Sequence, residues 1–598
     1  MNRKKGVGIL AAAALFALAA CGGGGGSEEG ESSGGFTEGA SGDKAKDPTA
    51  EGPAPEVEGA KTGGEIDVLV PDPDSGPDTL DPAALWSVTG NGLAQSLLFR
   101  SLTQFRLDPD TGSYVLVPDL ATDLGTPNDD FTEWKFTIKD GIKWENGDPV
   151  TAEDVAYGMK RSFDSENFAT GPGTSYSNPY FKGGAKYQGP YSSGDKFPAI
   201  TVDGNTLTLK MSTPFPEMDY YGIFPAMGPV PVKGDTAPPD YGLHPLATGP
   251  YKIDKFVPNK SLTLVKNDQW DPATDPARHQ YPDKYTFSFD TDPSVSDKTV
   301  LSTAGEGDNT IVTSMLAQSY TKAQQDGLSD RTLVGPQPCT GFSYPVYDKI
   351  KELEVRQALA FAYPYEDAWS AAGELVGVTL ANGVTDPSLG FGVLPPGMAG
   401  RQVFNPKIEG ETIHYDPDVA KKLLAKAGYE PGEYEVSWVY DASTPEGKAA
   451  AEQVKLAYEK SGFKATAYPY TGGSLYDVWT DPDNPLHKKI NIQGVAWCQD
   501  WPSAATFLPV LFGKGSAYNT GGFDEPSVDK RMDEIKTLPL DEQADAWGDL
   551  EQEVMTDYQP VINRGYYQVI FGFGSNIGGF ANDTSVGGAP NYRNIFVK

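Results

Sequence analysis

The stretch "WKFTIKDGIKWENGDPVTAEDVAYGMKR", residues 134–161, decides the fold class, because it sets a strand, a tight turn and a capped helix in succession. Up to residue 138 the side chains alternate between apolar and polar, which predicts a half-buried strand. Asp140-Gly141 is typical of a hairpin turn. Thr151 can cap the following helix, with Asp154 in the capping-box position. The stretch therefore predicts a strand followed by a capped helix.

Length and charge narrow the possible functions. The chain has 598 residues, too many for a single core, so we expect about two to four domains. Its 82 acidic residues outweigh 48 basic ones, for a net charge of −34. A surface of this sign repels phosphates and anionic membranes, so we expect no nucleic-acid partner. The charge can also serve solubility alone.

The N-terminus predicts export. Basic residues precede an apolar run from Gly6 to Ala20, which is too short to span a bilayer and is typical of a signal peptide, residues 1–20. The run ends in Leu18-Ala19-Ala20-Cys21, which resembles the bacterial lipobox, where the cysteine is lipidated after cleavage. An ordinary cleavage site beside a chance cysteine is the alternative. We expect a lipid-anchored protein on the extracytoplasmic face of the cell membrane.

The composition after the signal peptide predicts a tether. Residues 21–63 are rich in Gly, Ser, Glu and Pro and contain a single aromatic residue. Such a segment buries too little apolar surface to offset its ordering entropy, so we expect a disordered linker behind the lipidated Cys21.

The two remaining cysteines are Cys339 and Cys498. In an exported protein a pair of this kind is expected to form a disulfide. Two separate buried thiols are the alternative.

No catalytic motif stands out. The four histidines are scattered without metal-ligand spacing, and neither a nucleophile elbow nor a phosphate-binding loop is present. We therefore expect no enzyme activity, no cofactor and no metal site. A secreted hydrolase stays open as an alternative, because 82 acidic residues leave room for an unmarked carboxylate pair.

Several motifs, in order along the chain, resemble the family-5 extracellular solute-binding proteins, the peptide- and nickel-binding components of bacterial ABC importers. The stretches that carry the resemblance are "LVPDLATD" (116–123), the opening stretch (134–161), "ATGPYKIDKFVPNKSLTLVKNDQW" (247–270), "ELEVRQALAFAYPYEDAW" (352–369), "HYDPDVAKKLLAKAGY" (414–429) and "AWCQDWPSAATFLPVLF" (496–512). Because the whole set occurs in family order, the resemblance is far more specific than any one motif.

The resemblance implies a two-lobed, periplasmic-binding-protein-like α/β fold with a hinge and an extra subdomain in the first lobe. The expected ranges are 64–105, 233–338 and 561–598 for lobe 1, 106–232 for the inserted subdomain, and 339–560 for lobe 2.

The resemblance also proposes a ligand site. In peptide-binding members, the Asp of the G-W-C-x-D motif contacts the ligand's α-amino group, and here that residue is Asp500. Trp497 and Trp501 flank it and can wall the pocket, and Tyr518 falls in a loop that the family places near the cleft. Some members carry an Arg where this chain has Gly494. The alternatives are a turn-capping Asp500 and tryptophans that belong to the core.

The implied function is capture of peptides and their delivery to an ABC permease with a separate ATPase, by a protein that we expect to be a monomer. The alternatives are a nickel chelate, an opine or another cationic solute as the ligand, and a peptide sensor for signalling.

Overall fold

The computed structural model of the chain describes residues 45–71, 76–516 and 518–598. The expected signal peptide and the lipidation of Cys21 lie outside the described residues. Within them, no helix is both long and apolar enough to cross a membrane.

The C-terminal part of the expected linker, residues 45–63, is packed on the folded body, and this part of the prediction is wrong. Ala50 and Ala54 are buried, and Ala50 packs beside Val115 and Val117. Lys46 forms an ion pair with Asp219 at 2.5 Å. Composition misled here because small alanines bury little area individually yet fill gaps between larger neighbours.

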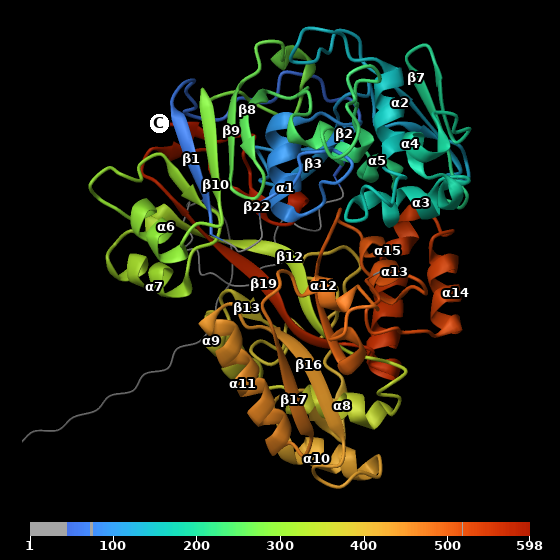
Figure 1. Ribbon diagram of the computed structural model, residues 1–598, viewed down its shortest axis with the longest axis vertical. Helices are drawn as coiled ribbons and strands as arrows, with labels where there is room; N and C mark the ends of the chain where they lie inside the picture. Colours follow the sequence, from blue (N-terminus) through green and yellow to red (C-terminus); the bar gives the residue numbers. More distant parts are fainter. Residues whose placement is uncertain (1–44, 72–75, 517) are drawn as a thin grey trace, which may run out of the picture. The chain divides into compact units, whose positions relative to one another are not determined.

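One mixed sheet forms the centre of the fold (Figure 1), with nine strands among the described residues. Its strands, in spatial order, are β18 (Ile492–Cys498), β12 (Thr332–Pro345), β19 (Ile562–Phe573), β11 (Thr310–Val312), β1 (Glu65–Val70), β10 (Lys284–Phe289), β9 (Ser261–Lys266) and β8 (Tyr251–Val257), with β13 (Leu380–Ala381) beside β19. The strand β1 is parallel to β10 and β11, and the long strands β12 and β19 are antiparallel. The pairing of β12 with β19 therefore brings together chain segments that are far apart in sequence.

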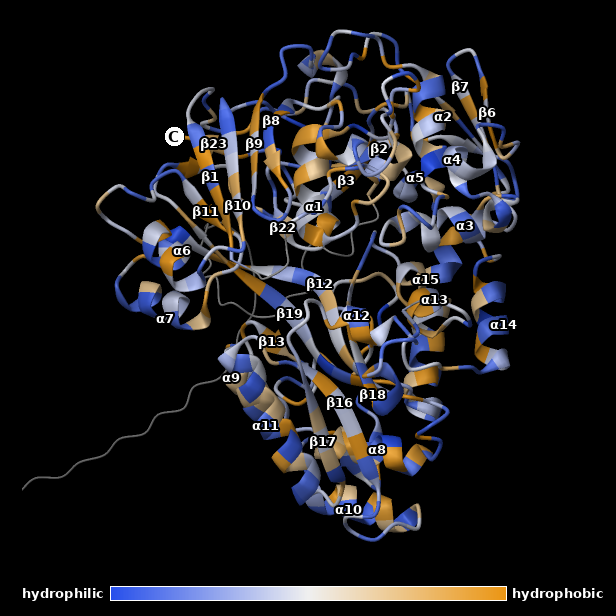
Figure 2. Ribbon diagram, viewed as in Figure 1, coloured by the Kyte–Doolittle hydropathy of each residue, from blue (hydrophilic) through white to orange (hydrophobic). Residues whose placement is uncertain are grey.

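The first core lies against β1, β9 and β10. Ile66, Val68 and Val70 alternate with more exposed residues along β1 and are fully buried. Figure 2 shows both hydrophilic and hydrophobic colours along this strand. They pack with Leu93 at the end of α1 (Val88–Leu93) and with apolar residues of the π-helix Ala94–Leu98. Each buried aliphatic side chain contributes about 1.5–3 kcal/mol.

The opening stretch of sequence lies in a separate small sheet. Its strands are β4 (Thr126–Pro127), β5 (Glu133–Thr137), β7 (Thr206–Lys210) and β6 (Ile200–Asp203). Helix α2 (Ala152–Arg161) begins with the predicted capping box between Thr151 and Asp154. The core here contains Trp134 and Phe136. The α/β class is confirmed.

A third region surrounds the parallel pair β16 (Glu435–Asp441) and β17 (Lys464–Tyr470). Helix α10 spans Pro417–Lys426, capped by Asp416, and Gly428 follows it with a φ of 92°. The remaining α-helices from residue 345 onward that have five or more residues are α8 (Leu353–Ala362), α9 (Tyr365–Ala371), α11 (Pro445–Lys460), α13 (Leu508–Phe512), α14 (Pro526–Ile535) and α15 (Leu540–Glu553). The boundaries of the lobes and of the inserted subdomain stay a prediction.

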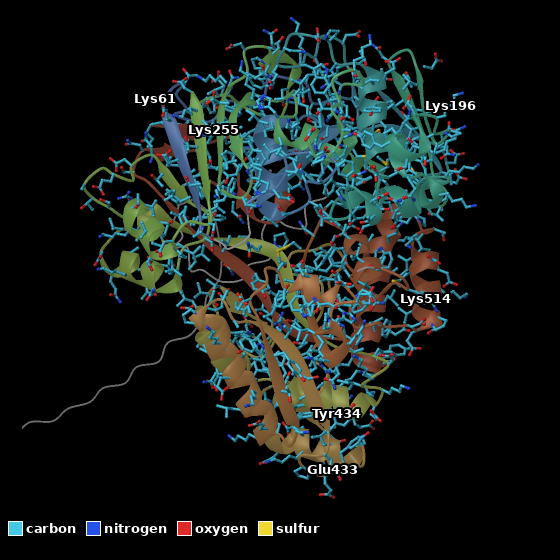
Figure 3. All side chains as sticks on the ribbon, viewed as in Figure 1. Lys61, Lys196, Lys255, Glu433, Tyr434 and Lys514 are labelled. Carbon is cyan, nitrogen blue, oxygen red and sulfur yellow. A yellow bond between two sulfur atoms is a disulfide. The ribbon has the colours of Figure 1, made fainter. Side chains whose placement is uncertain are left out.

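Charged side chains lie mostly at the surface. The labelled Lys61, Lys196 and Lys255 point away from the ribbon in Figure 3 and are exposed. One fully buried cluster has Arg100 and Arg278 set between Asp119 and Asp275 at 2.7–3.8 Å. We call it the buried ion network.

Candidate functional site

The stretch that contains Asp500 is fixed to the central sheet. Cys498 at the end of β18 faces Cys339 of β12 in the antiparallel register, and the two cysteines form a disulfide. The residue after Cys498 continues the pairing, because the Gln499 N–H donates to the Pro338 carbonyl at 2.9 Å. The backbone leading into Asp500 is therefore held on both sides of the covalent link.

Asp500 itself accepts two hydrogen bonds from distant parts of the chain. The Trp86 Nε1–H donates to Oδ1 at 2.6 Å, and the Tyr176 hydroxyl donates to Oδ2. Both donors are uncharged, and no Lys, Arg or His among the described residues forms an ion pair with Asp500. Burial raises the pKa of Asp500 to about 7, although the hydrogen bonds from Tyr176 and Trp86 act to lower it. A carboxylate enclosed in this way, without a counter-charge, is suited to binding a cation.

Aromatic rings enclose this carboxylate on several sides. The Trp86 ring centre lies 6.2 Å from Tyr176, 5.6 Å from Trp497 and 5.8 Å from Tyr518, each in an edge-to-face arrangement. Trp497 is 7% exposed, and its Nε1–H donates to the Thr506 carbonyl at 2.7 Å. We call Trp86, Tyr176, Trp497 and Tyr518 the aromatic box. A ring face attracts a cation, which strengthens the match to a positively charged group.

Trp501 is not part of the aromatic box, and its side chain is buried. Its side chain is 1% exposed and its Nε1–H donates to Glu217 at 2.9 Å. It packs 4.7 Å from the Tyr176 ring, within the core of residues 102–227. Trp501 thus supports Tyr176 from behind, and a direct ligand contact by Trp501 stays a prediction.

Gly494 has a steric explanation in the structure. A Cβ at this position would lie 2.8 Å from the Trp479 ring. Because the indole fills that space, no arginine fits there without moving Trp479. The packing of Trp479 therefore matches the presence of glycine at this position.

Strand β18 is also an edge of the sheet. The Tyr476 hydroxyl donates to the Ala496 carbonyl at 2.5 Å and accepts from the Ala496 N–H at 3.0 Å. One hydroxyl thus satisfies both outward backbone groups of Ala496, which an extended ligand chain could otherwise pair with.

Sequence reasoning missed Trp86, Tyr176 and Tyr476. Trp86 meets Asp500 across 414 positions of sequence and Tyr176 across 324. No local spacing pattern connects residues at such separations, and a lone Trp or Tyr is more often part of a core. The sequence feature that pointed to an aromatic site was the pair Trp497 and Trp501 on either side of Asp500.

A mixed sheet shared by distant segments, with a carboxylate in an aromatic box beside it, is compatible with the two-lobed class of extracellular solute-binding proteins. The chain belongs to the bacterial extracellular solute-binding proteins, family 5, whose family model matches residues 115–519.

Solved structures share this fold. The clavulanic acid biosynthesis oligopeptide binding protein 2 superposes with a TM-score of 0.77 at 23% identity, covering 92% of this chain and 99% of that one. Burkholderia pseudomallei OppA gives a TM-score of 0.67 at 22% identity, covering 91% of this chain and 100% of that one. Both confirm the two-lobed fold.

Similar sequences include proteins with different named ligands. The oligopeptide-binding protein OppA of Bacillus subtilis (strain 168) is 24% identical over 469 residues, 75% of this chain and 78% of that protein. Heme-binding protein A of Haemophilus influenzae is 22% identical over 487 residues, 77% of this chain and 80% of that protein. Membership of the family therefore leaves the ligand to be argued from the site.

Proposed function

We propose that the protein captures peptides between its two lobes and delivers them to the permease of an ABC importer, which a separate ATPase powers. The observation that carries the proposal is Asp500, a carboxylate beside aromatic rings whose hydrogen-bond donors among the described residues, Trp86 and Tyr176, are both neutral. A peptide supplies the missing cation through its α-ammonium group.

The electrostatics favour this ligand over a neutral one. An enclosed carboxylate without a cation is costly, and its raised pKa of about 7 is the expression of that cost. An incoming ammonium removes the cost and forms a charge-assisted hydrogen bond. Trp86 and Tyr176 already orient the carboxylate oxygens, so little reorganisation accompanies binding.

The edge of β18 supports an extended ligand. If the Tyr476 hydroxyl moves away, the Ala496 N–H and carbonyl become free to pair with a peptide backbone. Backbone pairing of this type gives affinity without reading side chains. The names of the oligopeptide-binding relatives support the same ligand class.

The cellular setting is part of the proposal. We infer export and a lipid anchor at Cys21 from the sequence before the folded body. A monomer whose lobe 1 (64–105, 233–338 and 561–598, with the subdomain 106–232) closes on lobe 2 (339–560) would present both lobes to the permease. Under this proposal the protein binds its ligand and catalyses no reaction.

Replacement of Asp500 tests the proposal. We expect Asp500→Ala to weaken binding of tetra-alanine by about 2 kcal/mol or more, because a charge-assisted bond is lost. Binding of N-acetyl-tetra-alanine, which has no ammonium, should change little. Isothermal titration calorimetry of both peptides with both proteins gives the comparison, and equal losses for the two peptides would refute the assignment. A nickel chelate or an opine that binds the purified protein when neither peptide does would replace peptides as the ligand class.

A further inference from the structure

A cavity of about 340 Å³ lies where α1, β12 and β19 meet. Its walls come from widely separated segments, including Val88 and Thr89 of α1, Gln337 of β12, and Tyr567 of β19. Among the residues that line the cavity, Glu374 is the single charged side chain. The volume is enough for one or more amino-acid side chains.

Hydrogen bonds within the same wall of the cavity hold the Glu374 carboxylate in place. The Thr379 hydroxyl donates to Oε2 at 2.5 Å, and the Thr379 carbonyl accepts from the Gln568 N–H of β19 at 2.9 Å. The other oxygen, Oε1, has no donor among the described residues. Burial raises the pKa of Glu374, while the hydrogen bond from Thr379 acts to lower it.

Among the residues that the structure describes, no cation neutralises this carboxylate. The lining contains no Lys, Arg or His. Arg564 acts on Tyr567 from beyond the lining and forms no ion pair with Glu374 among the residues that the structure describes. The single charge of the cavity is therefore negative and available.

The sheet register relates this cavity to Asp500. Because Gln499 pairs with Pro338, Asp500 follows at the level of Gln337, which lines the cavity. Pro336 pairs with Gln568 on the next strand, and Thr379 bonds to Gln568 beyond it. Three strand spacings separate Asp500 from Thr379, or about 15 Å. A peptide that runs from Asp500 across β12 and β19, a path that excludes pairing with the outer edge of β18, covers this distance with two or three residues and one long side chain.

We propose that this cavity is a side-chain pocket for a lysine or arginine at the second, third or fourth position of the ligand, with Glu374 binding the basic group. The inference rests on the proposed function, since it assumes that the ligand's ammonium is at Asp500. With this pocket, the site would recognise one side chain of the ligand in addition to the peptide backbone and the N-terminal ammonium.

The test uses tetra-alanine peptides that carry one lysine or, at the same position, one methionine, which has a similar length and no charge. We expect the lysine peptide to bind at least fivefold more tightly at one of positions 2, 3 and 4, measured by calorimetry at about 0.15 M salt. Glu374→Gln keeps an acceptor for Thr379 and should bring the lysine-to-methionine ratio close to one.

Glu366→Gln is the matched control, because Glu366 is an exposed acid on α9, just before Glu374 in sequence. Both variants change the net charge equally, so a general attraction of lysine to the acidic surface would affect them alike. A wild-type ratio near one at all three positions, or a preference that survives in Glu374→Gln, overturns the pocket while leaving the proposed function intact. Failure of the wild-type protein to bind any of these peptides overturns both.

Discussion

Two enclosed aspartates in this protein have opposite electrostatic surroundings. Asp275 belongs to the buried ion network, where Arg278 and Arg100 lie 3.1 and 3.8 Å from its carboxylate. Burial alone would raise the pKa of Asp275, but the two guanidinium groups hold it well below its usual range. Asp500 is enclosed by aromatic rings, receives only neutral donors, and has a pKa raised to about 7.

The difference separates a structural carboxylate from a binding one. The ion network satisfies its charges within the chain, so it has nothing to offer a ligand and serves to join segments. Asp500 has its oxygens oriented but its charge unmatched, and only a molecule from outside can supply the cation. Burial of an acidic residue is therefore uninformative until its partners are named.

The largest effect expected from this comparison is on stability. Arg278→Met would leave Asp119 and Asp275 buried beside one guanidinium, and we expect the free energy of unfolding to fall by about 3–5 kcal/mol. Urea unfolding followed by tryptophan fluorescence measures the change. Asp500→Asn is the counterpart, and it should leave the free energy of unfolding unchanged or slightly higher, because it removes a charge that has no partner. A comparable loss in both variants would contradict the distinction between the two aspartates.

A smaller effect is expected at the donor to Asp500. Trp86→Phe keeps an aromatic ring in the box but removes the Nε1–H that donates at 2.6 Å. We expect binding of a free-amine peptide to weaken by about 1 kcal/mol, because a hydrogen bond to a charged group is lost. Calorimetry with tetra-alanine and its N-acetyl form checks this, and a loss of equal size for the acetylated peptide would instead assign Trp86 to general packing.

The local elements of the fold could be predicted from the sequence. The capping box at Thr151 and the glycine stop at Gly428 follow from short-range hydrogen bonding and backbone sterics, which neighbouring residues determine. The linker prediction failed at residues 45–63, because packing against Val115 and Val117 depends on the folded surface. The composition of a segment indicates how much apolar area it can bury by itself. It does not indicate whether the folded part of the protein has a surface against which the segment can pack.

Only half of the candidate site was open to prediction. Asp500 and Trp497 lie close together in sequence, and the motif that contains them drew attention to both. Trp86 and Tyr176 are brought to Asp500 by the arrangement of the domains, so no spacing in the sequence marks them. Whether Trp501 walls the pocket depends on the orientation of its ring, which the sequence does not determine. In the structure the ring packs in the core of residues 102–227.

The most direct test of the central claim is the proton released when a free-amine peptide binds. In the free protein Asp500 has a pKa of about 7, so below pH 7 it is mostly protonated, and a bound ammonium stabilises the charged form and expels the proton. Affinity should therefore fall as the pH drops below about 7.

Calorimetry of tetra-alanine binding at pH 6.5, in buffers of different ionisation enthalpy, counts the protons. We expect a substantial fraction of one proton to be released per peptide by the wild-type protein, since a group whose pKa is raised to about 7 is largely protonated at this pH. Asp500→Asn should release close to none. Binding by the wild-type protein without proton release would contradict the assignment of Asp500 as the ammonium site.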